Sequence, residues 1–384
     1  MAVLCGNCSG KLIFNPASQK LECVSCGSKF RPEDVKDVNA EAHSKYYDTR
    51  VYVCGHCGAE VVTSDTEVST FCVYCGNPAI VFSRISREYR PDGLIPFKVT
   101  KEEAIRNIRS KFIKNPIVPQ AVKNKLTPEN LRGIYIPYWI INADYTEADF
   151  LSGEVQHGKR RTTEYFTRAG EVSLKNIPID GSDILNDDTS RKLEPFYLEN
   201  AVDFDEDYLN GFYSNTTDLT YKDLRRSAAE RCHKLFEEEV VESVTAENVK
   251  IQDTHYWVDI HDDPIYMMMP VWFFTFRHED TPYTILVNGQ SGKVVGTMPF
   301  EKKRIVALAV ISFILIAVLL ALLVCGTLFC VDLWAFIAAA GLLGISAFSI
   351  YALIRSIIGI RKLSKNLKLT QSESMFRYVR RRQG

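Results

Sequence analysis

The stretch IVALAVISFILIAVLLALLVCGTLFC, residues 305–330, has 26 residues and no charged side chain. Asp332 follows it, and the next 22 residues, 333–354, are again uncharged. About 20 apolar residues in a helix cross the ~30 Å hydrocarbon core of a bilayer. The alternative is a buried hairpin in a large soluble domain, but soluble helices are rarely apolar on every side over two such lengths. The sequence therefore predicts a two-helix transmembrane hairpin over residues 305–354.

Basic residues flank this hydrophobic stretch on both sides. They are Lys302, Lys303 and Arg304 before it, and Arg355, Arg361, Lys362, Lys365 and Lys368 after it. Because Lys and Arg stay on the cytoplasmic side of a membrane, both termini are expected in the cytosol and Asp332 outside. The first residues lack the charged and apolar regions of a signal peptide. The pattern predicts a multi-pass protein of the cell membrane whose residues before 305 are cytosolic.

The tail, residues 355–384, has nine basic side chains and one acidic side chain, Glu373. Apolar residues are interleaved with them at spacings that can share one helical face. A basic amphipathic segment beside a span is attracted to anionic lipid, by about 1 kcal/mol for each basic residue near the surface. The sequence predicts a basic juxtamembrane tail that binds membrane lipid. A solvated tail that only sets the orientation remains the alternative.

The charge of the chain is unevenly distributed, although its formal net value is −1. Residues 1–90 have equal numbers of acidic and basic side chains, residues 91–300 have a net charge of −10, and residues 301–384 have +9. The length suggests two or three domains. The basic end coincides with the predicted membrane end, and the acidic part coincides with the bulk of the cytosolic chain.

Eight of the eleven cysteines lie in the first 82 residues, in four CxxC pairs. Fourteen residues separate the two pairs of each set, and the sets are Cys5, Cys8, Cys23 and Cys26, followed by Cys54, Cys57, Cys72 and Cys75. Two thiolates three positions apart on a tight turn form one edge of a zinc tetrahedron, and a second pair closes it. The repeat therefore predicts two structural Zn²⁺ ions, each held by four cysteines.

Short strand-like runs flank these cysteines, and a glycine directly follows three of the four CxxC pairs, where a turn with positive φ suits glycine. This pattern predicts tandem β-rich zinc ribbons at residues 1–30 and 51–82, joined by a linker at 31–50. His56 lies in a knuckle whose site already has four thiolates, so we expect an exposed turn residue. Disulfides are disfavoured in a reducing cytosol, and the spacing is not that of a ferredoxin. Iron in place of zinc remains open.

Many zinc ribbons bind nucleic acid, but the charge argues against that partner here. Residues 1–90 are neutral, and each centre of four thiolates and one Zn²⁺ adds a charge of about −2. Phosphate groups attract charge of the opposite sign. A module that contacts protein is therefore the better prediction.

Residues 94–300 are predicted to form an α+β cytosolic domain, after a second linker at 83–93. Capping boxes at Thr100 and Thr220 predict the starts of two helices. A capped helix followed by a Pro-x-Trp strand occurs twice, which suggests two related halves. The other predicted elements are strands at 134–141, 255–261 and 267–276, mixed strand and loop at 164–179, a turn at 152–153, and a hairpin at 283–296.

No catalytic constellation is recognisable in the sequence. The chain has no GxxxxGK[ST] loop, no GxSxG and no HExxH motif. A solvated acidic loop is expected at Asp203, Asp205, Glu206 and Asp207. The side chains expected in the core are Trp139, Trp257, Trp272, Phe273, Phe274 and Cys232. The protein is predicted not to be an enzyme, and an unrecognised site within residues 94–300 remains the alternative.

Four short sequences follow the cysteines in order: IPYW at 136–139, EPFYL at 194–198, YLNGFYSN at 208–215 and PVWFF at 270–274. With the tandem CxxC pairs and the terminal hairpin, they make the chain resemble bacterial membrane proteins with N-terminal TFIIB-type zinc ribbons. Genes of that family often neighbour those of phage-shock-protein-A-like and flotillin-like (SPFH) proteins. The resemblance implies a membrane anchor that recruits a flotillin-like partner, in connection with envelope stress.

Together these patterns predict a multidomain protein with tandem zinc ribbons, an α+β cytosolic domain and a C-terminal transmembrane helical hairpin. The predicted function is a non-enzymatic, membrane-anchored adaptor that recruits a cytosolic protein partner. The alternative is a membrane-tethered regulator that binds nucleic acid through its ribbons. A binding test on nucleic acid with its salt dependence separates the two.

Overall fold

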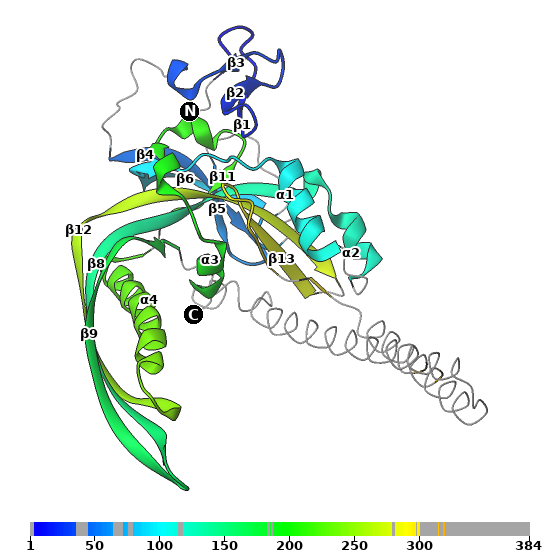
Figure 1. The fold of residues 1–384 in the computed structure, drawn as a ribbon. Helices are drawn as coiled ribbons and strands as arrows, with labels where there is room; N and C mark the ends of the chain where they lie inside the picture. Colours follow the sequence, from blue (N-terminus) through cyan, green and yellow to red (C-terminus); the bar gives the residue numbers. More distant parts are fainter. Residues whose placement is uncertain are drawn as a thin grey trace, which may run out of the picture.

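The computed structural model (Figure 1) describes most of the chain up to Pro299. The described residues are 4–35, 45–63, 72–75, 80–113, 118–182, 185, 187–217, 219–278, 281–296, 298, 299, 314 and 318. Within them, no helix is both long and apolar enough to cross a bilayer. The transmembrane hairpin predicted at 305–354 lies outside the described residues except for positions 314 and 318, and the tail at 355–384 lies outside them entirely.

The first cysteine unit contains a small antiparallel sheet. Its strands are β1 (Leu12–Asn15), β2 (Lys20–Cys23) and β3 (Lys29–Phe30). The turn between β1 and β2 is set by Asn15, whose Oδ1 accepts a hydrogen bond from the backbone N of Ala17 at 2.8 Å. Leu12, Phe14 and Leu21 are buried, so this sheet has one face in the core, as the β-rich prediction requires.

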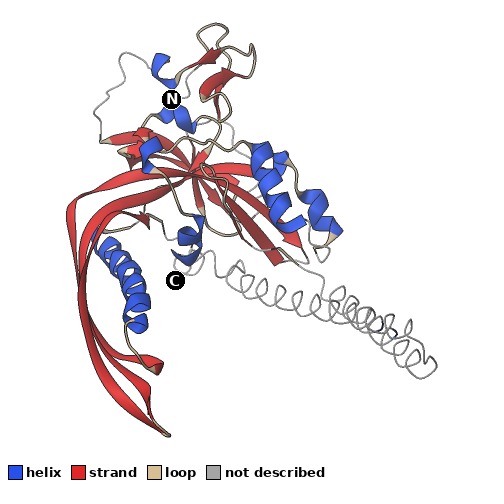
Figure 2. Cartoon of the chain, viewed as in Figure 1, coloured by secondary structure: helices blue, strands red, loops and turns tan. Residues whose placement is uncertain are grey.

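A second, mixed sheet of eleven strands forms the body of the molecule (Figure 2). The strands are β4 (Tyr46–Cys54), β5 (Glu60–Thr63), β6 (Ile80–Tyr89), β7 (Gly93–Leu94), β8 (Leu131–His157), β9 (Arg160–Asp180), β10 (Val202–Asp203), β11 (Tyr213–Ser214), β12 (Glu247–His278), β13 (Thr281–Asn288) and β14 (Val294–Gly296). Neighbours follow the order β10–β7–β12–β8–β11–β5–β4–β6, while β9 pairs with β8 and β13 pairs with β12 and β14. The predicted hairpin at 283–296 is confirmed by β13 and β14.

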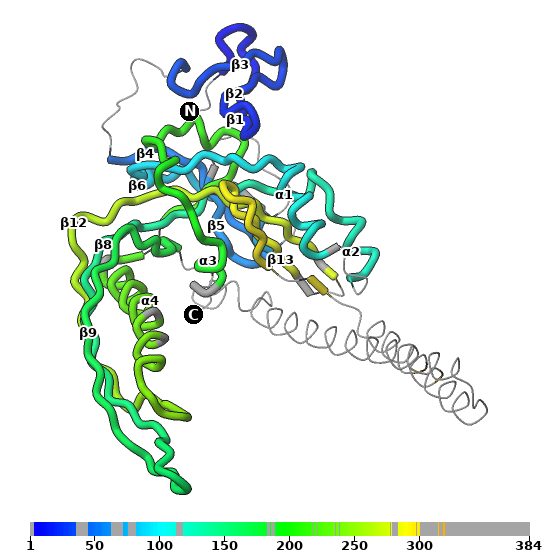
Figure 3. Tube along the Cα trace, in the orientation of Figure 1, coloured from blue at the N-terminus to red at the C-terminus, as the bar shows by residue number. Residues whose placement is uncertain are grey.

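The two longest strands, β8 and β12, run antiparallel for 27 and 32 residues. Their distal parts, residues 141–157 and 247–265, join β9 in a curved three-stranded sheet, which we call the extension. Figure 3 shows these three strands side by side, running away from the body. The strands predicted at 134–141, 255–261 and 267–276 are all confirmed as parts of β8 and β12.

Two predictions for the extension are wrong. The turn expected at 152–153 is absent, because β8 continues through it and the chain turns at Gly158, where φ is 62°. Gly153 instead permits close packing, since a Cβ there would lie 2.6 Å from Ala246 Cβ. Residues 164–179, expected as mixed strand and loop, are continuous strand.

Helix α4 (Tyr221–Glu242) lies along the concave face of the extension (Figure 1). It begins at the predicted capping box, because Thr220 Oγ1 accepts from Asp223 N and the Asp223 carboxylate accepts from Thr220 N, each at 3.3 Å. Cys232 is buried in this interface, as predicted. The buried partners include Leu224, Ala228, Phe236 and Val240 of α4, and Ile141, Tyr145, Leu151 and Val258 of the strands.

The remaining helices are short. Helix α1 (Lys101–Ile108) begins at the predicted Thr100 capping box, and its Asn107 donates a hydrogen bond to the backbone oxygen of Gly292 at 3.1 Å. Thus α1 is tied to the β13–β14 turn. The others are a π-helical turn at Arg109–Ile113, α2 (Gln120–Lys125), α3 (Asp187–Leu193), and 3₁₀ turns at Pro32–Asp34, Pro128–Asn130, Leu198–Asn200 and Glu206–Leu209.

The prediction of a linker at 83–93 is wrong, because strand β6 continues to Tyr89. Only β4 pairs with β6 in the described sheet, so β6 is an edge strand and most of its side chains are exposed. Its sequence therefore lacks the apolar alternation of an internal strand. Strand β4 itself begins at Tyr46, inside the segment 31–50 that was expected to link the cysteine units. These two strands make the second cysteine unit continuous with the large sheet.

Aromatic side chains fill the centre of the body. Phe97 stacks on Phe212 with 4.3 Å between ring centroids, and it packs against Trp272 at 4.7 Å. Trp272, Phe273 and Phe274 are buried, as predicted. Large aromatic rings contribute much of the burial that stabilises such a core.

The core position predicted for Trp257 is wrong. Side chains alternate between the two faces of a strand, and its neighbour Val258 points toward α4 and is buried. Trp257 therefore lies on the opposite face, where it is exposed. Arg225 of α4 donates to the backbone oxygen of Val258 at 3.0 Å, and its guanidinium lies 5.4 Å from the centroid of the Trp257 ring. Trp139 is partly buried.

Candidate metal centres

The structure brings the four thiols of the first set together. The sulfur atoms of Cys5 and Cys26 are 3.6 Å apart, and those of Cys8 and Cys23 are 3.4 Å apart. All four lie within 4.8 Å of one another. A tetrahedron with Zn–S bonds of ~2.3 Å has edges of about 3.8 Å. The spacing therefore fits a metal ion of the size of Zn²⁺.

Tight backbone turns position these thiols. In the first knuckle Ser9 N donates to Cys5 O at 2.7 Å, and in the second Gly27 N donates to Cys23 O at 2.9 Å. Both turns end in the left-handed region, with φ of 55° at Ser9 and 72° at Gly27. Gly10 is required by a close approach, because a Cβ there would lie 2.9 Å from Cys23 Sγ.

Polar neighbours favour the thiolate form at Cys26. The Ser28 hydroxyl is 3.1 Å from Cys26 Sγ, and Asn7 Nδ2 donates to that hydroxyl at 2.9 Å. Hydrogen bonds from the Ser28 side chain and backbone lower the pKa of Cys26 to about 6. Because the thiolate is the form that binds metal, this environment prepares Cys26 as a ligand.

The second set forms an equivalent cluster at the edge of the large sheet. The sulfur atoms of Cys54 and Cys75, and those of Cys57 and Cys72, are each 3.7 Å apart. All four again lie within 4.8 Å of one another. The eight cysteines singled out in the sequence thus form two groups of four that could hold two metal ions.

Two details of the second cluster match its sequence. Gly58 has a φ of 71° and its N donates to Cys54 O at 2.8 Å, as expected for a glycine after a CxxC pair. His56 is an exposed turn residue outside the cluster, as predicted. Hydrogen bonds with Cys57 and Cys75, together with burial, raise the pKa of Cys72, so a nearby positive charge such as Zn²⁺ is what would make it a thiolate.

The motif YLNGFYSN at 208–215 forms a contact between the first cysteine unit and the body, and we call this motif the seat of the first unit. Phe14 N donates to Asn210 O at 3.1 Å, and the ring of Phe14 packs on Tyr208 with centroids 4.9 Å apart. Gly211, with φ of 88°, lies so close that a Cβ would be 2.3 Å from Ile13 Cγ2. The sequence indicated this motif only through a resemblance and gave it no role.

The same motif also joins the second unit to the body. Its strand β11 runs parallel to β8 and antiparallel to β5. Ser214 Oγ donates to Val62 O at 3.4 Å. Farther along, Thr275 Oγ1 of β12 donates to Val73 O at 2.7 Å, beside Cys72. Both cysteine clusters are therefore held by the central sheet.

The motif EPFYL at 194–198 forms hydrogen bonds with the β13–β14 turn. Tyr197 N donates to Gln290 Oε1 at 2.7 Å, and Gln290 Nε2 returns a hydrogen bond to Tyr197 O at 2.9 Å. Asn288 Nδ2 donates to the backbone oxygens of Leu193 and Pro195 at 2.9 and 3.0 Å. These contacts give the motif a structural role.

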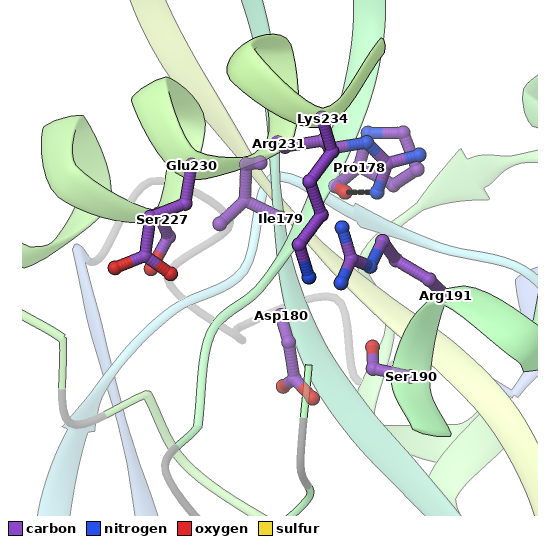
Figure 4. Close-up of a pocket in the computed structure, with 9 residues that line it drawn as sticks. All are labelled: Pro178, Ile179, Asp180, Ser190, Arg191, Ser227, Glu230, Arg231 and Lys234. Atoms are coloured by element: carbon purple, nitrogen blue, oxygen red, sulfur yellow. Dashed lines mark hydrogen bonds between the residues drawn. The ribbon is translucent and has the colours of Figure 1, made fainter. Parts of the chain in front are cut away.

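A small pocket of about 40 Å³ lies between α3, α4 and the end of β9 (Figure 4). Arg231 on its wall forms two hydrogen bonds with the Glu194 carboxylate at 2.6 and 2.7 Å, and one with Pro178 O at 2.7 Å. In Figure 4 the side chains of Arg191 and Lys234 point into the same space as Asp180. The charges of the lining residues are of both signs, and this arrangement stabilises the contact between α4 and the body.

The other polar candidates do not assemble into a site. Among the described residues, the two cysteine clusters are the groups of three or more side chains that could share a metal ion. His255 and His261 pair separately with Asp253 at 3.4 Å and Asp144 at 2.5 Å. The solvated acidic loop predicted at 203–207 is wrong in two respects: Asp203 is exposed but lies in β10, and Asp207 is buried in a 3₁₀ turn.

Sequence comparison finds a relative in Bacillus subtilis (strain 168), an uncharacterized protein named YdjG. It is 27% identical over 323 residues, which cover 79% of this chain and 91% of the relative. No family model matches the sequence, and no solved structure matches it. The name of the relative assigns no activity, so a function has to be argued from the residues of this chain.

Proposed function

We propose that this protein is a non-enzymatic adaptor in which two structural Zn²⁺ ions stabilise a platform for a cytosolic protein partner. The observation that carries the proposal is that each cluster consists of four thiols. Four protein ligands close a zinc site, whereas a catalytic zinc keeps one position open for water or substrate. The ions would therefore stabilise shape rather than supply chemistry.

The platform has an exposed apolar surface on the outward face of β4 and β6. This β4–β6 patch consists of Tyr46, Phe82, Ile85 and Tyr89, of which Ile85 is 68% and Phe82 is 52% exposed. Tyr46 is opposite Tyr89 in the register, and their rings meet at 6.0 Å. Clustered apolar residues at a surface mark protein interaction sites. The Phe82 end of the patch is close to the second cysteine cluster, because Phe82 is opposite Tyr52, two positions before Cys54 on β4. A metal ion in that cluster would therefore stabilise this end of the two strands.

The membrane anchor in this proposal is the pair of uncharged stretches at 305–330 and 333–354, with both termini in the cytosol. The proposed partner is a flotillin-like (SPFH) protein, which follows from the family resemblance. A membrane adaptor of this kind would need no catalytic group, and it would need a rigid surface that stays folded at the bilayer.

The test is binding between the full-length protein in detergent or nanodiscs and a purified flotillin-like protein of the same organism. The double variant Phe82→Glu with Ile85→Glu should weaken binding at least about tenfold, which corresponds to about 1.4 kcal/mol. Tyr165→Glu is the matched control, because Tyr165 is 65% exposed on the distant extension. Equal affinities for the double variant and the unchanged protein would contradict the proposal.

A second candidate is a membrane-tethered regulator that binds nucleic acid. Strand β6 contains Phe82 and Tyr89 together with Arg84 and Arg87, and aromatic and basic side chains in one groove can bind single-stranded nucleic acid. However, Arg84 forms a salt bridge with Glu60 at 3.1 Å and Arg87 is opposite Asp48 in the register. Binding to RNA or DNA that weakens steeply with salt, and that Arg87→Gln reduces, would favour this candidate over the adaptor.

A further inference from the structure

Two carboxyl groups are buried between α4 and the extension. Glu147 and Asp149 are 0% and 1% exposed, although acidic side chains are rarely fully buried without a partner. They are two positions apart on β8, so both point to the same face of the sheet. That face is the one covered by α4, because Tyr145 and Leu151 on either side belong to the α4 interface.

The hydrogen bonds of the two groups are unequal. Glu147 Oε1 is 2.8 Å from His233 Nδ1 of α4, and the Tyr145 hydroxyl donates to Glu147 Oε2. Asp149 Oδ1 accepts from the Thr254 hydroxyl at 2.7 Å. Asp149 Oδ2 is buried without a hydrogen-bond partner among the described residues. An ionised carboxylate oxygen in that position would lose its hydration without compensation.

Two side chains near the pair can carry positive charge. His233 faces Glu147 and is charged only when protonated. Arg168 of β9 is opposite Asp149 in the register, but its guanidinium bonds to Ser243 at the end of α4, with Nε 3.1 Å from Ser243 Oγ. The other titratable neighbours are Cys232 of α4, Tyr145 of β8 and Tyr256 of β12. Burial raises the pKa of Glu147 most, the hydrogen bonds from Tyr145 and His233 lower it, and the neighbouring Asp149 side chain raises it further, so the net shift is upward.

We propose that Glu147 keeps a proton in the folded protein and donates it to Asp149 Oδ2, and that loss of this proton releases α4 from the extension. This hydrogen bond would give a partner to the Asp149 oxygen that otherwise has none among the described residues. A metal ion is a less suitable partner for the pair than a proton. Among the described residues, no third acidic or histidine side chain completes a metal-binding group with Glu147 and Asp149. The pair is then a pH-sensitive latch, distinct from the metal clusters and from the β4–β6 patch.

The direction of the effect follows from linkage. Glu147 holds its proton to higher pH in the folded protein than a free glutamate does, so the protonated pair stabilises the closed interface in mild acid. That stabilisation is lost as pH rises and Glu147 ionises. For one proton, the equilibrium constant for opening should increase by up to about tenfold per pH unit in this range.

Hydrogen exchange of the α4 backbone amides in the full-length protein measures that opening. Between pH 5 and 9, after correction for the intrinsic pH dependence of exchange, protection of residues 224–240 should fall by up to about tenfold per pH unit. Asp149→Asn places a permanent NH₂ donor at Oδ2, so the slope should flatten and protection at high pH should increase. Asp144→Asn, on the exposed face of the same strand, is the matched control and should keep the slope.

Two results would overturn the latch: a flat profile for the unchanged protein, or an identical slope with Asp149→Asn. If Asp149→Asn does not fold, Glu147→Gln carries the same test, because its amide can donate to Asp149. A slope retained in Glu147→Gln overturns the latch as well.

Discussion

The carboxyl group of Asp207 is buried where the first cysteine unit rests on the body. Asn210, whose backbone oxygen binds Phe14, also donates from Nδ2 to Asp207 Oδ1 at 3.3 Å. Burial, followed by the charges of Asp205 and Glu206, raises the pKa of Asp207 to about 7. The seat of the first unit is therefore next to a carboxyl group that changes charge near neutral pH.

Asp207→Asn should make the protein more stable than the unchanged chain at pH 8. The raised pKa means that this group stabilises the fold most in acid, and that the contribution is lost as pH rises from about 4 to about 7. At pH 8 the free energy of unfolding, measured in denaturant, should be higher for Asp207→Asn than for the unchanged chain by at most about 4 kcal/mol. Asp203→Asn is the control, because Asp203 is exposed in β10. Parallel pH profiles for the two variants would rule out this role.

Gly211 is fixed by two separate constraints: a φ of 88° and the contact with Ile13. Gly211→Ala should destabilise the protein by about 2–4 kcal/mol, the sum of left-handed strain and overpacking. Gly158→Ala separates the two, because Gly158 has a φ of 62° and open space around a Cβ, so only the strain of about 1–2 kcal/mol applies. Equal shifts in the denaturant midpoint for the two variants would show that the Ile13 contact does not matter.

At the scale of elements, the two cysteine clusters are attached differently. Cys54 is the last residue of β4 in the large sheet, whereas Cys23 is the last residue of β2 in the separate three-stranded sheet. Buried residues of both units nevertheless join the core of the body. The first unit has its own small sheet. Its backbone is joined to the seat by the hydrogen bond from Phe14 N to Asn210 O. Loss of metal from the second cluster should therefore disturb the large sheet, while loss from the first should stay local.

Cys57→Ser and Cys8→Ser should each reduce the bound zinc from two ions per chain to one. Cys57→Ser should also expose β4, β5 and β12 to limited proteolysis, whereas Cys8→Ser should expose only residues before 36. Cys232→Ser is the control, because this buried thiol lies outside both clusters and two ions should remain. Identical digestion patterns for Cys57→Ser and Cys8→Ser would refute the difference in attachment.

The elements that could be predicted are those whose signals lie in neighbouring residues. The capping boxes at Thr100 and Thr220 are local chemistry, and both helices begin there. Strand β6 was missed because an edge strand exposes most of its side chains and has no apolar alternation to detect. Gly153 was misread as a turn because its role is to admit Ala246, a contact across 93 positions of sequence.

At the scale of the whole molecule, the eight cysteines are the part of the site that the sequence predicted residue by residue. A repeated CxxC spacing is informative because the metal imposes it. The seat at 208–215 and the buried pair at Glu147 and Asp149 could not be predicted in this way. Their roles arise only when β8, β11, β12 and α4 are brought together, and neither has a spacing of its own.

The position of that seat in the chain has a consequence for biosynthesis. The second cluster is complete in sequence at Cys75, but strand β11, which pairs with β5, ends at Ser214. At about 5–20 residues per second, a ribosome needs roughly 7–28 s to make the intervening segment. The β12 residues that cover Cys72 and Val73 emerge later still. During that interval the four thiols lack the sheet that buries them, so a metal ion that binds this cluster has to reach the thiols before an oxidant does.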